Sequence, residues 1–564
     1  MEVIGIDLGT TNCALAYTRG EAVELFAIPQ FVHPGEVRED PLLPSFLFLD
    51  ESGPIVGLLA QRKGLDNAGR LVSSAKSWLS HGGVDRNGDI LPPNAPEGVP
   101  RISPVEASRR YLHHLREAWN AKNPQTPFDS HQVLVAVPAS FDEVARELTL
   151  KAATGAGYRN VILLEEPQAA FYNWIERQPE WRGQVSAGDL ILVIDIGGGT
   201  TDFSLIQVKD QGGELTLDRI AVGDHILLGG DNIDAALAHH IAQQLPKKID
   251  ALQFHALWQH CRAAKERLLE EDSNEKELSI AILGRGAGVV GGSIKTRLKR
   301  EDLEAILLDG FLPRVALDDE PQGRRAPLAE FGLPFASDAA ITRHLAHFLR
   351  HQQAAPTHVL FNGGVLRAPL VRRRILDVLN SWLPTPAKPL EANELMHAVA
   401  RGAAYYGLAR QGKGIRVRGG IPRAYYIGIE PAMPAVPGLR PPLKALTVAP
   451  FGMEEGTGVQ IPDRRFALSV GEKAQFRFFA STERKNDAAG LLLDEVPPEL
   501  EETAPVEAAL DGKPGETAAV TLETLVTETG MLELWFVARD GRRWKLEFNV
   551  RPNKTLEAGR RNPA

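Results

Sequence analysis

Two short phrases with the same pattern constrain the fold of this chain more than any other feature. VIGIDLGTTNC, from residue 3, and VIDIGGGTTDF, at residues 193–203, each run from an apolar strand that ends in an aspartate into glycines and two threonines. Because apolar, β-rich residues resume directly after each turn, each phrase predicts a β-hairpin. A dinucleotide-binding fingerprint is excluded, since its glycines must lead into a helix.

The tips of these predicted hairpins are suited to binding an anion. Glycines can take positive φ angles that turn backbone N–H groups toward a ligand, and the threonine hydroxyls add donors. Asp7 and Asp195 end strands beside the tips, where a carboxylate would repel bare phosphate but would hold a hydrated Mg²⁺ that neutralises it. Glycine-rich turns can also merely reverse strands. The repeated pattern favours two facing hairpins that hold one polyphosphate.

Two glycine pairs that precede predicted helices support this interpretation. Gly229-Gly230 come before a helix that Asp231 is predicted to cap, and Gly363-Gly364 follow a strand from Thr357. A helix that begins after a glycine pair lets a ligand approach the backbone closely. An ordinary turn and cap explains either pair alone, whereas the whole set favours a nucleotide site.

Composition limits the compartment and the partners. The 564 residues are 43% hydrophobic and 24% charged, as in globular proteins, and no secretory signal or membrane-spanning run is visible. Cys13 and Cys261 are too few for a disulfide framework, so we expect a cytoplasmic protein. The net charge of −9 argues against nucleic acid and acidic membranes as partners. Any phosphate site must therefore be built locally.

From residue 1 to about residue 412 the chain resembles the seventy-kilodalton heat-shock proteins, the DnaK-type chaperones. The motifs IGIDLGTTN, VLVAVPASF, LLEEPQAAF, VIDIGGGTTDF, ILLGGDNID and NGGVLRAP occur in that family's order. Actin, its bacterial cytoskeletal relatives and the sugar kinases share only the two phosphate hairpins. The resemblance implies an α/β, two-lobed, actin-like ATPase with duplicated ribonuclease H-like subdomains, which binds ATP or ADP with Mg²⁺.

The resemblance also implies roles for individual residues. Asp7 and Asp195 correspond to the carboxylates that hold Mg²⁺ through water, Lys76 to the lysine near the γ-phosphate and the attacking water, and Glu166 to the carboxylate that positions that water. Phosphoryl transfer needs this charge neutralisation and alignment more than covalent help. Lys76 by itself would more often be a surface lysine. The implied catalytic residues are Asp7, Lys76, Glu166, Asp195 and Thr200. The implied phosphate-site residues are Gly9, Thr10, Thr11, Asn12, Gly197, Gly198, Gly199, Thr200 and Asp202.

The part of the predicted site that would hold the nucleoside, here called the nucleoside end, departs from the family pattern. In FHALWQHCRAAKERLLEED the family's lysine is kept as Lys265, while its acidic and arginine positions are exchanged between Arg262 and Glu266. We predict that Arg262 stacks on adenine with Arg367 on the other side, and a surface Arg262–Glu266 pair is the alternative. The residues assigned to this end are Gly229, Gly230, Arg262, Lys265, Glu266, Gly363, Gly364 and Arg367.

Past residue 412 the helical periods give way to short alternating strands, and Asp540-Gly541 predicts a hairpin turn. We predict a nucleotide-binding ATPase domain at residues 1–412, a linker at 413–420 and an all-β, sandwich-like domain at 421–564. This order resembles the family's β-sandwich domain, which binds extended apolar polypeptide. A β-sandwich could equally be a protein-docking module.

Three departures mark a divergent member of the family. The linker segment GKGIRVRGGIP is basic where the family's is apolar and acid-ended, and from the short stretch after the last predicted strand we expect no helical lid. Ile162 stands where the family has the arginine that receives a J-domain co-chaperone. The resemblance therefore does not imply a J-domain protein as a partner.

Two functions fit these observations. The first is a slow ATPase and chaperone, in which the nucleotide controls the binding of unfolded polypeptide by the C-terminal β domain. The second is a nucleotide-gated scaffold or exchange factor that binds a partner chaperone with little turnover. A sugar kinase would need a hexose site, for which the sequence has no signature.

A histidine-rich stretch, HLAHFLRH, places His344, His347 and His351 on related turns of a predicted helix. No carboxylate or cysteine in the pattern completes a set of metal ligands. We interpret the stretch as an ordinary helix face.

Overall fold

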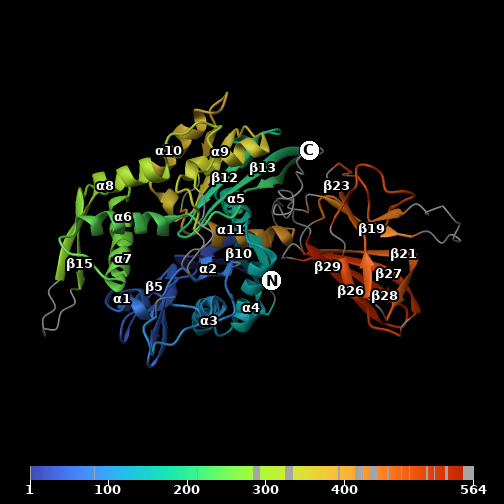
Figure 1. Cartoon of the computed structure of the whole chain (residues 1–564), viewed down its shortest axis with the longest axis horizontal. Helices are drawn as coiled ribbons and strands as arrows, with labels where there is room; N and C mark the ends of the chain where they lie inside the picture. Colours follow the sequence, from blue (N-terminus) through green and yellow to red (C-terminus); the bar gives the residue numbers. More distant parts are fainter. Residues whose placement is uncertain are drawn as a thin grey trace, which may run out of the picture. The chain divides into compact units, whose positions relative to one another are not determined.

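The structure is a computed structural model of the whole chain. It describes residues 2–549 except 82, 94, 160, 212–213, 284–292, 324–334, 392–393, 413–420, 422, 431–442, 454–455, 472, 482, 485, 504–505, 514 and 528–530. Contacts divide the chain into two compact units, Met1–Val417 and Arg418–Ala564. The predicted linker at 413–420 lies outside the described residues. Figure 1 shows the units coloured along the sequence.

The first unit contains two large sheets. The strands of the first sheet are β1 (Val3–Leu8), β2 (Asn12–Arg19), β3 (Ala22–Leu25), β6 (Leu42–Pro44), β10 (Gln132–Val137) and β11 (Val161–Glu165). Those of the second sheet are β12 (Leu190–Ile196), β13 (Thr201–Gln211), β14 (Glu214–Val222), β17 (His358–Asn362) and β18 (Lys388–Leu390). Both predicted hairpins are present, since β1 pairs antiparallel with β2 and β12 with β13.

These two sheets share one plan. Their strand orders are β11-β10-β1-β2-β3, with β6 beside β2, and β14-β13-β12-β17-β18. The central strand of each, β1 or β12, pairs antiparallel with the strand after its hairpin and parallel with a later one, β10 or β17. Asp7 and Asp195 therefore occupy equivalent positions, each one residue before the end of a central strand.

Helices cover both faces of the sheets, which explains why β1 and β12 are apolar along nearly their whole length. Helices α3 (Pro104–Lys122) and α4 (Glu143–Gly155) share a core with the first sheet, and α6 (Gly230–Gln244), α7 (Ala251–Leu268), α9 (Ile341–Gln352) and α10 (Pro369–Asn380) share one with the second. Helix α5 (Glu166–Arg177) packs on the second sheet and α11 (Ala398–Arg410) on the first. Both lie in the middle of this unit (Figure 1). The α/β character expected of this part is confirmed.

Smaller elements complete the first unit. Helix α2 (Ala75–Leu79) is one short stretch that carries Lys76. The other helices and strands are β4 (Ile28–His33), β5 (Glu36–Asp40), β7 (Leu47–Asp50), β8 (Gly53–Val56), α1 (Leu58–Asp66), β9 (Leu71–Val72), β15 (Glu277–Leu283), β16 (Ser293–Lys299) and α8 (Arg300–Ala305).

Helix α11 approaches its neighbours so closely that two glycines are required. A Cβ atom on Gly402 would lie 1.7 Å from the backbone oxygen of Ala169 in α5. One on Gly5 of β1 would lie 2.3 Å from the backbone oxygen of Ala400. Backbone atoms cannot turn aside as a flexible side chain can, so α11 joins α5 and the first sheet through direct backbone contact.

We expect Gly402→Ala to destabilise the first unit by about 1–3 kcal/mol or more, because the added methyl group must push α11 away from α5. The change can be measured as a lower thermal unfolding midpoint of the full chain. Gly310→Ala is the matched control: Gly310 lies in the helical turn Ile306–Phe311 with no atom within 4 Å of the added Cβ. Its effect should stay within about 0.5 kcal/mol. Equal effects of the two substitutions would contradict this account of α11.

Among the described residues of the second unit, the regular elements are strands joined by turns, with no helix. Its sheets run β24-β20-β19-β23-β25, β21-β27-β28-β29 and β22-β26. The bounds are β19 (Ala424–Ile429), β20 (Lys444–Ala449), β21 (Thr457–Val470), β22 (Lys473–Phe476), β23 (Phe478–Ser481), β24 (Leu492–Leu493), β25 (Glu501–Glu502), β26 (Val506–Ala509), β27 (Glu516–Val526), β28 (Met531–Ala538) and β29 (Arg543–Asn549).

The two larger sheets of this unit share one apolar core. It brings Ile427 and Leu446 of the first sheet together with Leu522 and Leu534 of the second, as in a β-sandwich. Strands β28 and β29 pair antiparallel around Asp540-Gly541, which confirms the predicted hairpin.

Candidate functional site

The first unit contains a cavity of about 720 Å³ between its two sheets and helices α6, α7 and α11. Its wall includes every site residue predicted from the sequence except Gly199, Asp202 and Gly229. The predicted residues on the wall are Asp7, Gly9, Thr10, Thr11, Asn12, Lys76, Glu166, Asp195, Gly197, Gly198, Thr200, Gly230, Arg262, Lys265, Glu266, Gly363, Gly364 and Arg367. Residues far apart in the sequence thus face one space.

The tips of the two hairpins meet at this cavity. A Cβ atom on Gly198 would lie 2.0 Å from Thr11 Oγ1, and one on Gly199 would lie 3.0 Å from Thr10 Cγ2 and 2.4 Å from Ser77 Oγ. The second hairpin therefore has no room for side chains where it passes the first. Gly199 is not on the cavity wall because it packs against Thr10 and Ser77.

Neighbouring segments hold both tips in place. Ser45 Oγ donates to the Gly9 carbonyl at 2.7 Å, and the Ser45 N–H donates to the Thr11 carbonyl at 2.8 Å. At the second tip, the N–H groups of Gly230 and Asp231 donate to the carbonyls of Gly197 and Gly198 at 3.0 and 2.7 Å. The first turn of α6 thus binds the second hairpin directly.

The predicted cap of α6 is wrong in one detail. The capping residue is Gly229, whose N–H donates a hydrogen bond to Asn232 Oδ1 at 3.0 Å. Asp231 lies inside the first turn. The carboxylate of Asp231 instead accepts a hydrogen bond from Ser74 Oγ at 2.5 Å and pairs with Arg262. Asp231 therefore connects α6 to other segments of the chain and does not cap its own helix.

Lys76 and Glu166 form a buried ion pair at one end of the cavity, with Asp7 and Asp195 close to it. Burial lowers the pKa of Lys76, but Glu166 and Asp7 outweigh burial and leave this pKa above its usual value, so the amine is charged. Burial raises the pKa of Asp7 to about 7, opposed by Lys76. Burial and Glu166 hold the pKa of Asp195 well above its usual range. One cation faces three acids here, so the site can accept further positive charge.

Asp202 lies behind the wall in a chain of polar side chains. Ser140 Oγ donates to the Asp202 carboxylate and lies 2.6 Å from His225 Nδ1, while His225 Nε2 lies 2.9 Å from Ser80 Oγ. Burial raises the pKa of Asp202 to about 7, and the Ser140 hydrogen bond opposes this rise. Asp202 also accepts a hydrogen bond from Thr200 and interacts with the charges of Glu166 and Lys76, so it connects this polar chain to the wall of the cavity.

At the other end of the cavity, Arg262 belongs to a buried charge network. Its side chain is only 6% exposed, its Nε donates to Asp234 Oδ2 at 3.1 Å, and its guanidinium pairs with Asp231. Lys265 Nζ lies 2.7 Å from Asp234 Oδ1. The alternative of a surface Arg262–Glu266 pair is therefore wrong. We infer that the main role of Arg262 is to stabilise the cavity wall. Its donors are directed at two aspartates, and its guanidinium carbon lies 5.5 Å from the centre of the Phe46 ring.

Three residues that contact the site, Asn362, Asp234 and His225, were not predicted from the sequence. Asn362 donates from Nδ2 to Asp195 Oδ2 at 2.7 Å, and Asp234 holds both Arg262 and Lys265. Asn362 directly precedes Gly363 in the motif NGGVLRAP and could have been found there. Asp234 lies one turn after Asp231 on α6, a spacing that marks a shared face. His225 carries no local signal.

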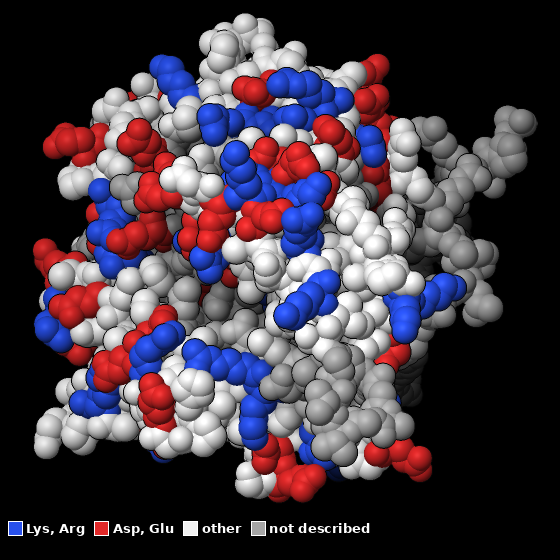
Figure 2. Space-filling model, turned by 90° about the vertical axis from the view of Figure 1, so that its left-hand side faces the viewer, with Lys and Arg blue, Asp and Glu red and all other residues white. Residues whose placement is uncertain are grey.

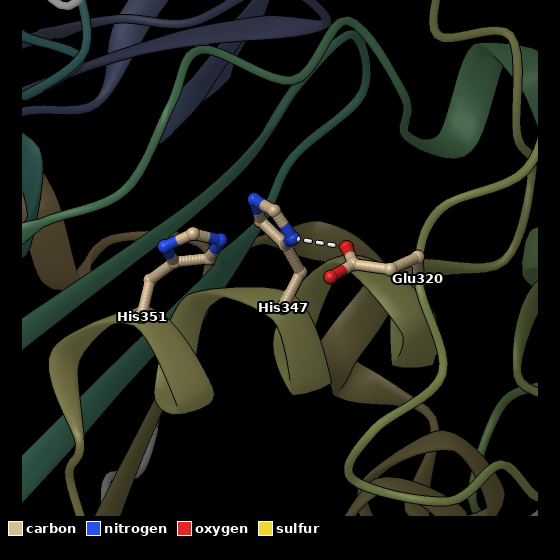
Figure 3. Close-up of side chains that lie close together, drawn as sticks. All are labelled: Glu320, His347 and His351. Carbon is tan, nitrogen blue, oxygen red and sulfur yellow. Dashed lines mark hydrogen bonds and ion pairs between the residues drawn. The ribbon is translucent and has the colours of Figure 1, made fainter. Parts of the chain in front are cut away.

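The histidine-rich stretch is also corrected. The structure brings a carboxylate, Glu320, next to His347 and His351 of α9 (Figure 3). The statement that no carboxylate completes this set is therefore wrong, because the missing acid comes from a segment 27 residues earlier than His347.

The surface and the helices add two observations. Basic and acidic side chains are intermixed over the face drawn in Figure 2, so neither sign dominates it.

Across the part of the chain that the structure describes, no helix combines the length and the apolar character needed to cross a membrane.

Comparison with known proteins identifies the family. The fold and the site define an α/β protein in which two sheets of one plan face a single cavity with paired glycine hairpins. The family described as Hsp70 protein matches residues 3–316, more than half of the 564 residues. The chain belongs to the Hsp70 family.

Curated relatives agree with this assignment. A chaperone protein HscA homolog of Paracidovorax citrulli (strain AAC00-1) is 29% identical over 368 residues, which cover 58% of this chain and 54% of the relative. The HscA homolog of Acidovorax sp. (strain JS42) is 32% identical, over 54% of this chain and 47% of its own length. The HscA homolog of Verminephrobacter eiseniae (strain EF01-2) is 29% identical, over 70% of this chain and 57% of its own length. The chain spans about half the length of the curated relatives it matches.

Proposed function

We propose that this protein is an ATP-dependent chaperone of the Hsp70 type. It binds ATP with Mg²⁺ in the cavity of the first unit, an actin-like ATPase domain, and hydrolyses it slowly. The bound nucleotide controls the binding of unfolded polypeptide by the second, β-rich unit. The observation that carries this proposal is the meeting of the two hairpin tips beside the Lys76–Glu166 pair. The curated relatives are named as chaperone proteins, which points the same way.

The residues present fit a magnesium-bound nucleotide. Asp7, Asp195 and Glu166 supply acidic oxygens, which a hydrated Mg²⁺ prefers as neighbours. Asn362 lies on the cavity wall, and its buried Oδ1 has no hydrogen-bond partner among the described residues, so it can accept a hydrogen bond from a ligand or its water. The glycines of both tips let phosphate oxygens approach backbone N–H groups. When bound, Mg²⁺ neutralises charge on the phosphates.

The chain's own residues then carry the reaction. Lys76 Nζ, held charged among carboxylates, would bind the phosphate that is transferred and orient the attacking water. Glu166 accepts a hydrogen bond from Lys76 with one oxygen and can orient that water with its carboxylate. Phosphoryl transfer depends mainly on such alignment and on electrostatic stabilisation. Asp7 and Asp195, at equivalent strand ends, would hold the hydrated cation.

The second unit offers a place for polypeptide. A cavity of about 490 Å³ is lined by Leu443, Phe479, Val496, Pro497, Pro498 and Leu500, with Arg477, Glu495 and Glu502 around them. Apolar lining with a few polar groups is typical of sites that take side chains of an extended peptide. The chaperone proposal places one apolar side chain of a client there.

The scaffold or exchange factor remains the second candidate. The observation that favours it is the altered nucleoside end, where the guanidinium of Arg262 is directed at Asp231 and Asp234. A nucleotide that is held mainly by its phosphates could gate the binding of a partner chaperone without being turned over.

Single-turnover ATP hydrolysis by the full chain separates these functions. The rate is measured with and without a disulfide-containing protein that reduction and alkylation keep unfolded, and the same protein with its disulfides intact, and therefore folded, is the control. We expect slow hydrolysis that the unfolded form accelerates and the folded form does not. Binding of ATP without hydrolysis would support the scaffold instead, and no binding of ATP would contradict both.

A further inference from the structure

A second cluster of chemically active side chains lies away from the cavity. Glu320, His347 and His351 each offer one ligand atom, and these atoms lie within 4.8 Å of one another. Among the residues the structure describes, this is the one group of three or more histidine, cysteine or acidic side chains with such spacing. None of the three lines the nucleotide cavity.

The two histidines are placed by helix α9. Its buried face includes Leu345, Phe348 and Leu349, and Phe348 stacks on Phe203 of the second sheet with ring centres 5.8 Å apart. This packing fixes the orientation of α9 and leaves His347 and His351, one turn apart, on its outer side. Their ring centres are 4.2 Å apart, and both rings project from the same side of the helix (Figure 3).

Glu320 approaches from a separate segment. One of its oxygens, Oε2, lies 2.5 Å from His347 Nδ1, while the other pairs with Arg350. Arg350 also donates to the Asp318 carbonyl at 3.1 Å, so it holds this segment against α9. The arginine leaves Oε2 directed at the histidines (Figure 3).

We propose that Glu320, His347 and His351 bind a divalent transition metal ion of the zinc type. Two imidazoles and one carboxylate form a ligand set that such an ion accepts, with a further position for water. A single carboxylate does not suit Ca²⁺ or Mg²⁺, which prefer several oxygen ligands. The 4.8 Å span needs only small side-chain rotations, since a tetrahedral ion holds its ligand atoms about 3 Å apart. The ion would replace the hydrogen bond between His347 and Glu320.

The bound ion would link two segments of the first unit. Glu320 lies between α8 and α9, and the histidines lie on α9, so the ion would fasten the stretch around Glu320 to the helix. Arg350 would orient the ligating carboxylate from outside, as outer partners of metal ligands commonly do. Glu320 and His351 are exposed and His347 is half-buried, so an ion can reach these ligands directly from solvent.

The test is a titration of the full chain, prepared without a polyhistidine tag and stripped with a chelator, with Zn²⁺ in a calorimeter. We expect one saturable site. Glu320→Gln, His347→Ala and His351→Ala should each weaken it at least about tenfold, since even the loss of an outer partner costs roughly 10–100-fold. Co²⁺ serves as a second probe, because its visible absorption reports the number and kind of ligands.

His240→Ala is the matched control. His240 is on α6, its side chain is 34% exposed against 35% for His347, and it also lies near a carboxylate, Asp302, at 3.6 Å. This variant should bind Zn²⁺ like the unchanged chain. No saturable binding, or binding that the three substitutions leave intact, overturns the proposal. Binding that depends on the histidines but not on Glu320 overturns it as a three-ligand site. ADP binding is measured in the same samples, and its retention shows that each variant is folded.

Discussion

Replacing Lys76 with methionine is expected to reduce the single-turnover rate of ATP hydrolysis about 100-fold or more while ADP still binds. Lys76 Nζ is the cation that the structure places among Glu166, Asp7 and Asp195. Methionine keeps most of the volume of the side chain and removes its charge. The loss of one well-placed donor to a developing charge typically costs about 10²–10³ in rate. The carboxylates that remain would also repel the phosphates more strongly.

The rate is measured by rapid quenching after ATP is mixed with an excess of protein, and ADP affinity is measured by calorimetry on the same variant. Lys122→Met is the control, because Lys122 is on α3 and pairs on the surface with Glu39 at 2.8 Å. It should hydrolyse ATP like the unchanged chain. A Lys76→Met rate within about threefold of normal would falsify the assignment of Lys76.

The parts of the site that the sequence predicts are those that local pattern determines. A hairpin needs only its strands and its turn, so VIGIDLGTTNC and VIDIGGGTTDF could be recognised without knowledge of the rest of the chain. Their meeting followed from the repeated pattern and from the family resemblance. The close contact of Gly198 with Thr11 shows why the second tip carries three glycines.

The parts that were missed or wrong depend on contacts between distant segments. The sequence predicted Arg262 either stacked on adenine or paired with Glu266 on the surface, but α6 brings Asp231 and Asp234 to it from about 30 positions earlier. Glu320 reaches the histidines of α9 in the same way. A helical periodicity predicts which face of a helix is polar, but it does not reveal whether another element covers that face.

The same reasoning predicts a large loss of stability for Arg262→Met, by about 3–5 kcal/mol. The substitution leaves Asp231 and Asp234 buried, with side chains 5% and 1% exposed, and removes their shared cation. An uncompensated buried charge costs this much because water no longer solvates it. Lys265 still pairs with Asp234, so most of the penalty should fall on Asp231. Arg267→Met is the control on the same helix, since its side chain is 62% exposed and its pair with Glu275 should contribute less than about 1 kcal/mol.

Urea unfolding of the full chain measures this loss. Tryptophan fluorescence is a suitable signal, because Trp258 of the same helix donates to the Asp231 carbonyl at 3.1 Å. Adding Asp231→Asn to Arg262→Met removes the unpaired charge and should restore much of the stability. Nucleotide affinity should return with it if Arg262 acts through the wall of the cavity. If instead the double variant regains stability but still binds ATP weakly, the guanidinium contacts the base, as the sequence alone had predicted, and the structural role is secondary.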